Sequence, residues 1–370
     1  MTALPDHDPA WFRQPTPRPV VSDARFLGLV ERRLEVFLDD RCGELVGVSP
    51  DLEPVIRTVR ELARGGKRLR ATFAYWGWRG ASAAGQQAAV DAAAALELFH
   101  LAALVHDDLM DHSDTRRGAS TAHETFAQGH RSDRLDGDAA AFGMGAALLI
   151  GDLCLAWSDE LLAGATLAPS SRASVRQVYD LMRSQVIAGQ YLDMLEQARP
   201  GLRREASERV LRFKSAKYTV EHPLLVGGAV SGASDGLLDA YSRFGIPVGE
   251  AFQLRDDVLG VFGDPARTGK PVGDDLRDGK KTLLVLAGLE RADAAQTELL
   301  RRHLGDRHLT EQQVCDLQTL LVETGALDEV ERQITQLTER GVDAIGNGAV
   351  PDHVATGLSD LAHHIAGRTA

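Results

Sequence analysis

The sequence predicts an all-α protein. Aromatic residues make up only 5% of the 370 residues, whereas alanine- and leucine-rich segments recur along most of the chain. Runs of β-branched and aromatic residues, which favour strands, are scarce, and apolar residues return at the spacing of an amphipathic helix. Hydrophobic residues account for 44% of the chain, enough for a sizeable core. We therefore expect helices packed around one another.

Short breaks with suitable capping chemistry separate the expected helices. Ser49 and Pro50 are typical of a helix start, Gly65 and Gly66 of a helix end, and the glycine-containing residues 263–273 of a loop. The expected helices, in order, are 23–45, 51–64, 67–82, 85–112, 138–164, 170–197, 205–231, 235–262, 275–291, 294–304, 310–325, 327–346 and 351–367.

The remaining segments set the expected domain organisation. Residues 1–21 are proline-rich and lack a core pattern, so we expect a disordered tail followed by a single all-helical domain over 22–370. The polar stretch 112–137 predicts a loop with a short helix at 121–128. The N-terminus lacks the apolar stretch of a signal peptide, and apolar runs such as 139–150 are too short to span a bilayer. A cytoplasmic protein without a transmembrane segment is therefore expected.

Charge and cysteine content exclude two other classes of protein. The net charge of -12 argues against nucleic acid as the main partner, because such a protein needs a basic face to replace phosphate counterions. The three cysteines, Cys42, Cys154 and Cys315, have neither a zinc-binding spacing nor the pattern of a disulfide framework. We expect them to be reduced and structural.

Two acidic clusters, in residues 106–118 and 252–260, indicate a metal site. Asp107 and Asp111 are four residues apart, so on a helix both carboxylates project from one face. Mg²⁺ prefers carboxylate oxygens and commonly completes its shell with water and substrate phosphate. One such pair alone is more often a solvated helix end. A second pair, Asp256 and Asp257, with basic residues close by in sequence, favours metal ions that hold a polyphosphate.

A basic motif begins at the glycines of residues 65–66. Lys67, Arg68 and Arg70 follow directly, and arginine can bind phosphate with two parallel hydrogen bonds. Cations at a helix N-terminus oppose the helix dipole unless an anion binds there, which favours binding over a merely exposed helix start. Lysines in the glycine-containing residues 269–271 and 279–282 could close over an anion, although such loop lysines are more often only solvent-exposed.

The helix expected before the first acidic cluster has a composition suited to a hydrocarbon chain. His100 and Ala103 share a helical face with Asp107 and Asp111, so charged ligands lie above small and apolar side chains. Small residues alone would indicate only close helix packing. Together with the acidic end, this face favours a ligand with an anionic head and an apolar tail.

Seven motifs now match a known family. GGKRLR, ELFHLAALVHDDLMDHSDTRRG, GQYLD, RFKSAK, FQLRDDVLGVFGD, GKPVGDDL and GKKT occur in the order and at the spacing of the trans-isoprenyl diphosphate synthases, also called polyprenyl synthetases. The resemblance covers residues 57–286 by motif. It implies an isoprenoid synthase-type helical bundle around a deep central cavity, paired as a homodimer.

The resemblance also implies a role for each motif residue. Three Mg²⁺ ions would be held by Asp107, Asp111 and Asp256, supported by Asp108 and Asp257. The allylic diphosphate would be contacted by Arg116, Lys214, Lys270 and Lys280. Isopentenyl diphosphate would be held by Lys67, Arg68, Arg70, His100 and Arg117. The region of the reacting carbons would be lined by Gln190, Asp193 and Gln253.

The implied reaction is a 1′–4, head-to-tail condensation of isopentenyl diphosphate with dimethylallyl, geranyl or farnesyl diphosphate. Metal ions and cations stabilise the leaving diphosphate, and the allylic carbocation then meets the double bond of the second substrate. No protein nucleophile is required. Gly260 stands where many relatives carry a third aspartate, and we expect Asp264 to substitute in part.

Product length in such enzymes depends on side-chain bulk below the first aspartate. Short-chain relatives place aromatic residues at the positions that here are Ala102 and Ala103. Phe99 is the first large side chain below, eight residues or about 12 Å from Asp107 along a helix. The sequence therefore predicts geranylgeranyl diphosphate, the twenty-carbon product.

Two alternatives share parts of this pattern. A class I terpene cyclase would use the same metal-assisted ionisation, but it has no need of the basic motif with His100 and Arg117 for a second diphosphate. A non-catalytic regulatory subunit would dimerise with a related synthase, but such partners usually lose metal ligands, and Asp107, Asp111 and Asp256 are all present.

Overall fold

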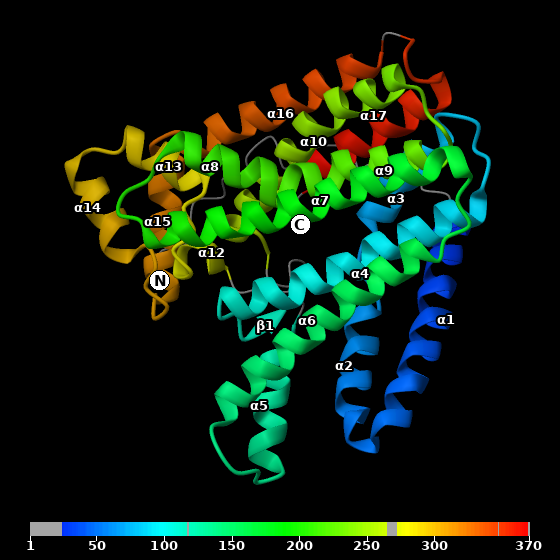
Figure 1. Cartoon of the computed structure of the whole chain (residues 1–370). Helices are drawn as coiled ribbons and strands as arrows, with labels where there is room; N and C mark the ends of the chain where they lie inside the picture. The colour runs from blue at the N-terminus through cyan, green and yellow to red at the C-terminus, as the bar shows by residue number, and fades with distance from the viewer. Residues whose placement is uncertain (1–23, 117, 265–271, 347, 369–370) are drawn as a thin grey trace.

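The computed structural model describes residues 24–116, 118–264, 272–346 and 348–368. The all-α prediction is confirmed, with a helical architecture throughout these residues (Figure 1). The helices are α1 (Ala24–Val48), η2 (Pro50–Leu52), α2 (Glu53–Ala63), α3 (Leu69–Arg79), α4 (Gln86–Met110), α5 (Ala122–Ser132), α6 (Ala139–Ala163), α7 (Pro169–Ala198), α8 (Arg204–Val210), η3 (Leu211–Glu221), α9 (His222–Val230), α10 (Asp235–Phe262), α12 (Asp274–Arg277), α13 (Leu283–Arg291), α14 (Ala294–His303), α15 (Glu311–Glu323), α16 (Ala326–Ile345) and α17 (Asp352–Ala366).

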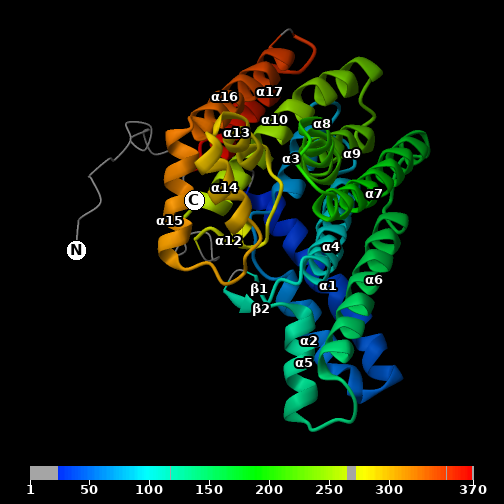
Figure 2. The same cartoon turned by 90° about the vertical axis from the view of Figure 1, so that its left-hand side faces the viewer.

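The segment expected as a loop after the first acidic cluster contains a small hairpin. Strands β1 (Thr115–Arg116) and β2 (Ala119–Ser120) pair antiparallel, with Thr115 opposite Ser120. The short helix expected there is α5, which extends four residues beyond 128 to Ser132. It packs against α6, and in Figure 2 α5 and the end of α6 beside it extend toward the bottom of the molecule, whereas the rest of α6 packs along α4. The hairpin carries Arg116 back toward the end of α4.

Two hydrophobic clusters share one long helix. The larger cluster includes residues of α1, α3, α4, α6, α7 and α9, and the smaller one lies among α13, α15 and α16. Helix α10 contributes Phe244 and Val248 to the first cluster and Leu254 and Val258 to the second. Figure 2 shows α13, α14 and α15 on the opposite side of the molecule from α6 and α7. Burial on two sides therefore fixes α10, which carries the second acidic cluster.

Two expected helices have a different form. The helix expected over 275–291 is divided into α12 and α13, because Gly279 has a φ of +71°, a left-handed conformation that interrupts a helix. The segment expected as one helix over 205–231 is continuous, but its middle part, η3, has the wider turn of a π-helix. A Cβ on Gly189 of α7 would lie 2.4 Å from the backbone nitrogen of Lys214, so α7 and η3 are in backbone contact at this lysine.

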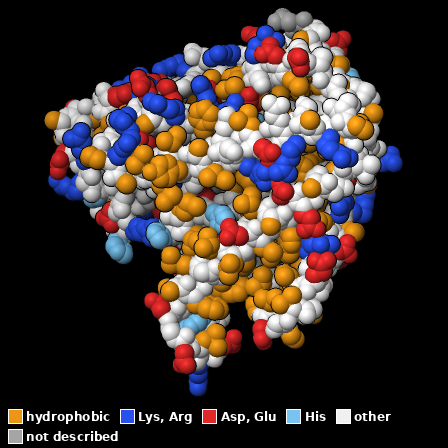
Figure 3. Space-filling view, in the orientation of Figure 1, with side chains coloured by type: hydrophobic (Ala, Val, Ile, Leu, Met, Phe, Trp, Pro, Cys, Tyr) orange, Lys and Arg blue, Asp and Glu red, His pale blue; other side chains and the backbone are white. Residues whose placement is uncertain are grey.

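Two of the helices are strongly apolar. By length and composition, α4 and α6 could each cross a membrane, and the most apolar windows of the two helices are 83% and 28% buried, respectively. Helix α4 is therefore a core helix, whereas α6 presents apolar side chains to the outside. Figure 3 shows hydrophobic side chains gathered over the region where Figure 1 places α6. The three cysteines form no disulfide, as expected, and Cys42 and Cys154 are buried.

Candidate active site

A cavity of about 1200 Å³ lies between α4, α6, α7, η3 and α10. Its mouth is lined by the two acidic clusters and the basic residues around them. Its depth is lined by apolar side chains, which include Phe99, Ala102 and Ala103 of α4, Leu155 of α6 and Val186 of α7. The cavity therefore combines a charged entrance with an apolar interior, as the sequence of α4 predicted.

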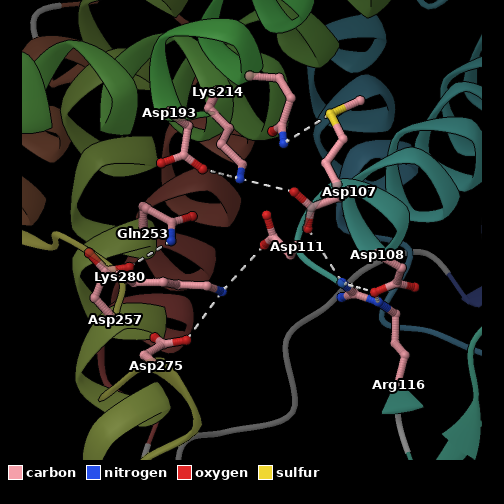
Figure 4. A network of polar contacts seen from close by, with 12 residues as sticks. Asp107, Asp108, Asp111, Arg116, Asp193, Lys214, Gln253, Asp257, Asp275 and Lys280 are labelled. Atoms are coloured by element: carbon pink, nitrogen blue, oxygen red, sulfur yellow. Dashed lines mark hydrogen bonds and ion pairs between the residues drawn. The ribbon is translucent and has the colours of Figure 1, made fainter. Parts of the chain in front are cut away.

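The first acidic cluster lies at the C-terminal end of α4 and is surrounded by cations. Nζ of Lys214 lies 2.9 Å from Oδ1 of Asp107, and Nη2 of Arg116 lies 3.4 Å from Oδ2 of the same residue. Arg116 also donates from Nε to Oδ1 of the buried Asp108 at 2.6 Å. Figure 4 shows Asp107 and Asp111 pointing toward the second cluster, with Arg116 behind them. Asp108 therefore anchors Arg116 beside the pair that faces the cavity.

The electrostatic environment gives Asp107 and Asp111 different pKa values. Burial alone would raise the pKa of Asp107, but the charges of Lys214, Lys280 and Arg116 outweigh it and lower that pKa to about 2. Burial and the negative charge of Asp107 raise the pKa of Asp111 to about 6. Asp107 is thus held as a carboxylate with cations on both sides, whereas Asp111 lacks a cation as close.

Lys214 links the first cluster to α7. Its Nζ lies 2.6 Å from Oδ2 of Asp193, in addition to its contact with Asp107. Burial would lower the pKa of Lys214, but these carboxylates reverse the effect and raise it. The lysine is therefore a fixed positive charge at the cavity mouth. Gln190, one turn before Asp193, lines the same cavity and lies against Sδ of Met110 at 3.7 Å.

The second acidic cluster faces the first from α10. Gln253 donates from Nε2 to Oδ1 of Asp257 at 2.8 Å, and Oδ1 of Asp256 accepts a hydrogen bond from Nη2 of Arg368 at 2.8 Å. Burial, and then the charge of Asp275, raise the pKa of Asp257 to about 8. Burial also raises the pKa of Asp256. Gln253, Asp257 and Asp275 form the left-hand side of the network in Figure 4.

Lys280 connects the two clusters. Its Nζ lies 3.2 Å from Oδ1 of Asp275 and 3.9 Å from Oδ2 of Asp111. The charge of Asp275 is the largest cause of the raised pKa of Lys280. The carboxylates of α4 and α10 thus converge on a site where Lys214 and Lys280 already provide positive charge (Figure 4).

The basic motif lies along the same cavity, and its two arginines are held in place by different neighbouring side chains. Lys67, Arg68 and Arg70 all line the cavity. Nη1 of Arg68 lies 3.3 Å from Oε2 of the buried Glu97, and Arg68 has a left-handed φ of 47° immediately before α3. The guanidinium of Arg68 is therefore oriented by a carboxylate of α4.

An aromatic side chain connects the other basic groups. The guanidinium carbon of Arg70 lies 4.0 Å from the centre of the Tyr218 ring, and Arg70 donates from Nη2 to Oγ1 of Thr219 at 3.0 Å. Nδ1 of His100 lies 2.8 Å from the hydroxyl oxygen of the same tyrosine. Tyr218 thus holds Arg70 and His100 in one place beside the cavity.

Several site residues were not found from the sequence. Asp275 lies within the motif GKPVGDDL but had no role assigned, and Glu97 and Tyr218 lie next to assigned residues without a distinguishing pattern. Arg368, near the end of the chain, carries no local signal at all. Arg117 and Lys270, both predicted to bind diphosphate, lie outside the described residues.

The donors present are those that Mg²⁺ prefers. Asp107 and Asp256 offer carboxylate oxygens at the cavity mouth, and Asp111 lies beside Lys280, which lines the same cavity. Lys214 contacts Asp107 and Arg368 contacts Asp256 directly. Hard divalent cations favour such an oxygen set, with space left for water and phosphate. The described site therefore fits magnesium together with an anionic ligand.

Comparison with known proteins agrees with the motifs. The family model for polyprenyl synthetases matches residues 53–321. The chain belongs to the polyprenyl synthetase family. Among curated members of this family, a geranylgeranyl diphosphate synthase of Mycobacterium tuberculosis is 32% identical over 362 residues, covering 92% of this chain and 96% of its own. A geranylfarnesyl diphosphate synthase of Aeropyrum pernix is 30% identical over 333 residues, covering 88% and 97%.

Solved structures in the polyprenyl synthetase family share the fold. A geranylgeranyl pyrophosphate synthase from Corynebacterium glutamicum, in complex with isoprenyl diphosphate and magnesium, superposes with a TM-score of 0.90 at 36% identity. The match covers 94% of this chain and 99% of that one. Both the resemblance inferred from the motifs and the isoprenoid synthase-type fold are therefore confirmed.

Proposed function

We propose that this chain catalyses the Mg²⁺-dependent 1′–4 condensation of isopentenyl diphosphate with an allylic diphosphate. The product is a trans-prenyl diphosphate, geranylgeranyl diphosphate in our proposal, and free diphosphate is released. The observation that carries the proposal is the cavity itself: two acidic clusters face each other at its mouth, Lys214 and Lys280 lie between them, and apolar side chains line its depth.

The allylic diphosphate would bind at the acidic mouth. Asp107, Asp111 and Asp256 would hold three Mg²⁺ ions, whose charge stabilises the leaving diphosphate when they are bound. Lys214, which contacts Asp107 at 2.9 Å, and Lys280 are already placed to add positive charge to the same diphosphate. Arg116 and Lys270 are proposed to contribute in the same way. The fixed cations lower the barrier because they need no reorganisation as the C–O bond breaks.

Isopentenyl diphosphate would bind along the basic motif. Lys67, Arg70 and His100 line the same cavity, and Arg68 and Arg117 are proposed to complete this site. Holding both substrates in one cavity makes the carbon–carbon bond formation effectively unimolecular. The buried apolar walls exclude water from the allylic cation, and the released diphosphate takes the final proton.

The two positions of α4 that lie four and five residues before Asp107 carry only small side chains. Ala102 and Ala103 line the cavity below Asp107, and Phe99, only 3% exposed, follows below them. The ring of Phe99 packs edge-on against Tyr179 and Tyr218, at centroid distances of 6.3 and 5.7 Å. Phe99 and Tyr218 both line the cavity, and their packed rings support our proposal of a twenty-carbon product.

The exposed apolar face supports a homodimer. Helices α6 and α7 expose large apolar side chains, of which the last three also line the cavity: Phe142, Met144, Leu148, Leu149, Leu181, Ile187, Tyr191 and Met194. Exposed apolar side chains in such number are a feature of subunit interfaces. We propose that a second copy covers it, in a cytoplasmic enzyme without a transmembrane segment. We further propose that residues 22–370 form one domain, because α10 is part of both hydrophobic clusters.

Product analysis tests the reaction and the product length together. The purified chain is incubated with isopentenyl diphosphate, Mg²⁺ and each of dimethylallyl, geranyl and farnesyl diphosphate, and the products are separated by length. Twenty-carbon product, abolished by EDTA, is expected. Hydrocarbon released from geranylgeranyl diphosphate alone would instead identify a terpene cyclase. No turnover by the pure chain, restored by a related synthase, would identify a regulatory subunit.

A further inference from the structure

The second acidic cluster has a glycine, Gly260, at the position where many relatives carry a third aspartate. Asp256 and Asp257 lie on α10, and Gly260 follows one helical turn after Asp256, so no side chain projects from that point. Asp264, which the sequence suggested as a partial substitute, lies beyond the end of α10 and is exposed. A carboxylate from another element occupies this position instead.

The volume next to Gly260 is filled by Asp275. A Cβ built on Gly260 would lie 1.9 Å from Oδ2, 2.5 Å from Cγ and 3.1 Å from Oδ1 of Asp275. The carboxylate of Asp275 therefore occupies the space into which a side chain at position 260 would extend. Asp275 is buried, at 8% exposure, and lines the cavity together with Asp256 and Asp257.

Contacts from distant parts of the chain fix Asp275 in this place. It belongs to the short helix α12, which packs against α10, and the neighbouring Leu276 is fully buried in the smaller hydrophobic cluster. The backbone carbonyl of Leu276 accepts a hydrogen bond from the nitrogen of Gly305 at 2.9 Å. Arg277 donates to the carbonyl of Leu309 at 3.3 Å. Asp275 is thus part of a rigid element rather than of an adjustable surface loop.

The charge of Asp275 acts on both clusters. Its Oδ1 lies 3.2 Å from Nζ of Lys280, which in turn lies 3.9 Å from Asp111. Groups that lie behind metal-bound carboxylates and water commonly orient them, and their loss weakens metal binding. We infer that Asp275 supplies the third carboxylate of the second acidic cluster, as a positioning residue for magnesium and diphosphate, in the space that Gly260 leaves open. This inference rests on the proposed function of the site.

A simpler role would be to hold Lys280 in place. A carboxylate moved from position 275 to position 260 would restore negative charge to the same volume, but it could also restore the contact with Lys280. The two roles differ in a Lys280→Met background, where Asp275→Ala should still weaken Mg²⁺ binding unless Asp275 acts only through Lys280. The chain also offers a charge-relocation test, with Gly260→Asp combined with Asp275→Ala.

Binding of Mg²⁺ in the presence of inorganic diphosphate is measured by calorimetry and by the rise in melting temperature. We expect Asp275→Ala to weaken Mg²⁺ binding by about 10- to 100-fold. The double variant should return to within about threefold of the wild type, because one carboxylate again occupies that volume. Gly260→Asp alone should be less stable, since its Cβ would meet the carboxylate of Asp275. Asp274→Ala, a change at the adjacent aspartate, is the matched control and should bind Mg²⁺ normally.

Two results would overturn the inference. One is wild-type Mg²⁺ affinity in a folded Asp275→Ala variant; the other is a double variant that binds no better than Asp275→Ala. If Asp275→Ala does not fold, Asp275→Asn, which keeps the size and removes the charge, must show the same loss of Mg²⁺ affinity. Because the readout is binding of Mg²⁺ with inorganic diphosphate, it is independent of whether the wild type makes the proposed prenyl product.

Discussion

Substitutions on helix α4 should change the length of the prenyl product in both directions. Phe99 and Ala103 both line the cavity from α4, and they lie eight and four residues before Asp107. At the rise of an α-helix, these separations are about 12 Å and about 6 Å. Phe99→Ala should therefore lengthen the products beyond twenty carbons, and Ala103→Phe should shorten them by bringing the first large side chain about 6 Å closer to the aspartates.

Phe99→Ala should also lower the stability of the protein. Phe99 is 3% exposed and contacts the rings of Tyr179 and Tyr218, so its truncation removes buried aromatic packing. Replacement of a buried phenylalanine by alanine typically lowers the free energy of unfolding by about 3–5 kcal/mol. Phe99→Leu leaves a smaller void and should shift the products less. Leu98→Ala is the control, because Leu98 is also buried on α4 but does not line the cavity.

The assay extends dimethylallyl diphosphate with radiolabelled isopentenyl diphosphate, so that products both shorter and longer than twenty carbons can form. The products are resolved by chromatography, and the melting temperature is recorded for each variant. Phe99→Ala should shift the main product to longer chains, Ala103→Phe to shorter ones, and Leu98→Ala should be less stable with unchanged products. Unchanged product distributions in both cavity variants, each folded and active, would refute the assignment of this shaft as the element that measures the product.

Three further outcomes are expected. Lys214→Met removes the ammonium 2.9 Å from Asp107, so kcat/KM for the allylic substrate should fall by about 10- to 100-fold, whereas unchanged kcat/KM would exclude Lys214 from the site. Arg368→Gln removes the guanidinium that contacts Oδ1 of Asp256, so this oxygen becomes available to Mg²⁺. The Mg²⁺ concentration that gives half-maximal activity should fall by about three- to fivefold, a modest effect because the ion pair is partly exposed. A rise in that concentration would contradict competition between Arg368 and Mg²⁺ for Asp256. Burial and Lys217 lower the pKa of His222 from 6.5 to about 3, so only the unfolded chain takes up this proton below pH 6.5. Between pH 6.5 and 5 this histidine should therefore remove roughly 2 kcal/mol of the free energy of unfolding, and His222→Gln should be less acid-sensitive in urea titrations; equal pH slopes would contradict this.

Local patterns predicted much of the helical architecture because helix periodicity and capping depend on residues three or four apart. The face of α4 is an example: His100 and Ala103, which share a helical face with Asp107, line the same cavity as Asp107. The break between α12 and α13 was missed, since its cause is a left-handed conformation at Gly279 within an otherwise helical composition. The π-helical turn at Lys214 was missed as well, because it arises where η3 contacts the backbone of α7 at Gly189.

The sequence by itself determined the helical class, the two acidic clusters and the basic motif, because these depend on residue type and short spacing. Only the tertiary structure decided which groups complete the site. Arg368 reaches Asp256 across 112 residues, and Asp275 fills the space beside Gly260 from a separate helix. The two members of each pair are too far apart in sequence for the periodicity of a helix to relate them. Their contacts follow from how α10, α12 and α17 pack, and that packing is set by the burial of apolar faces across the whole chain.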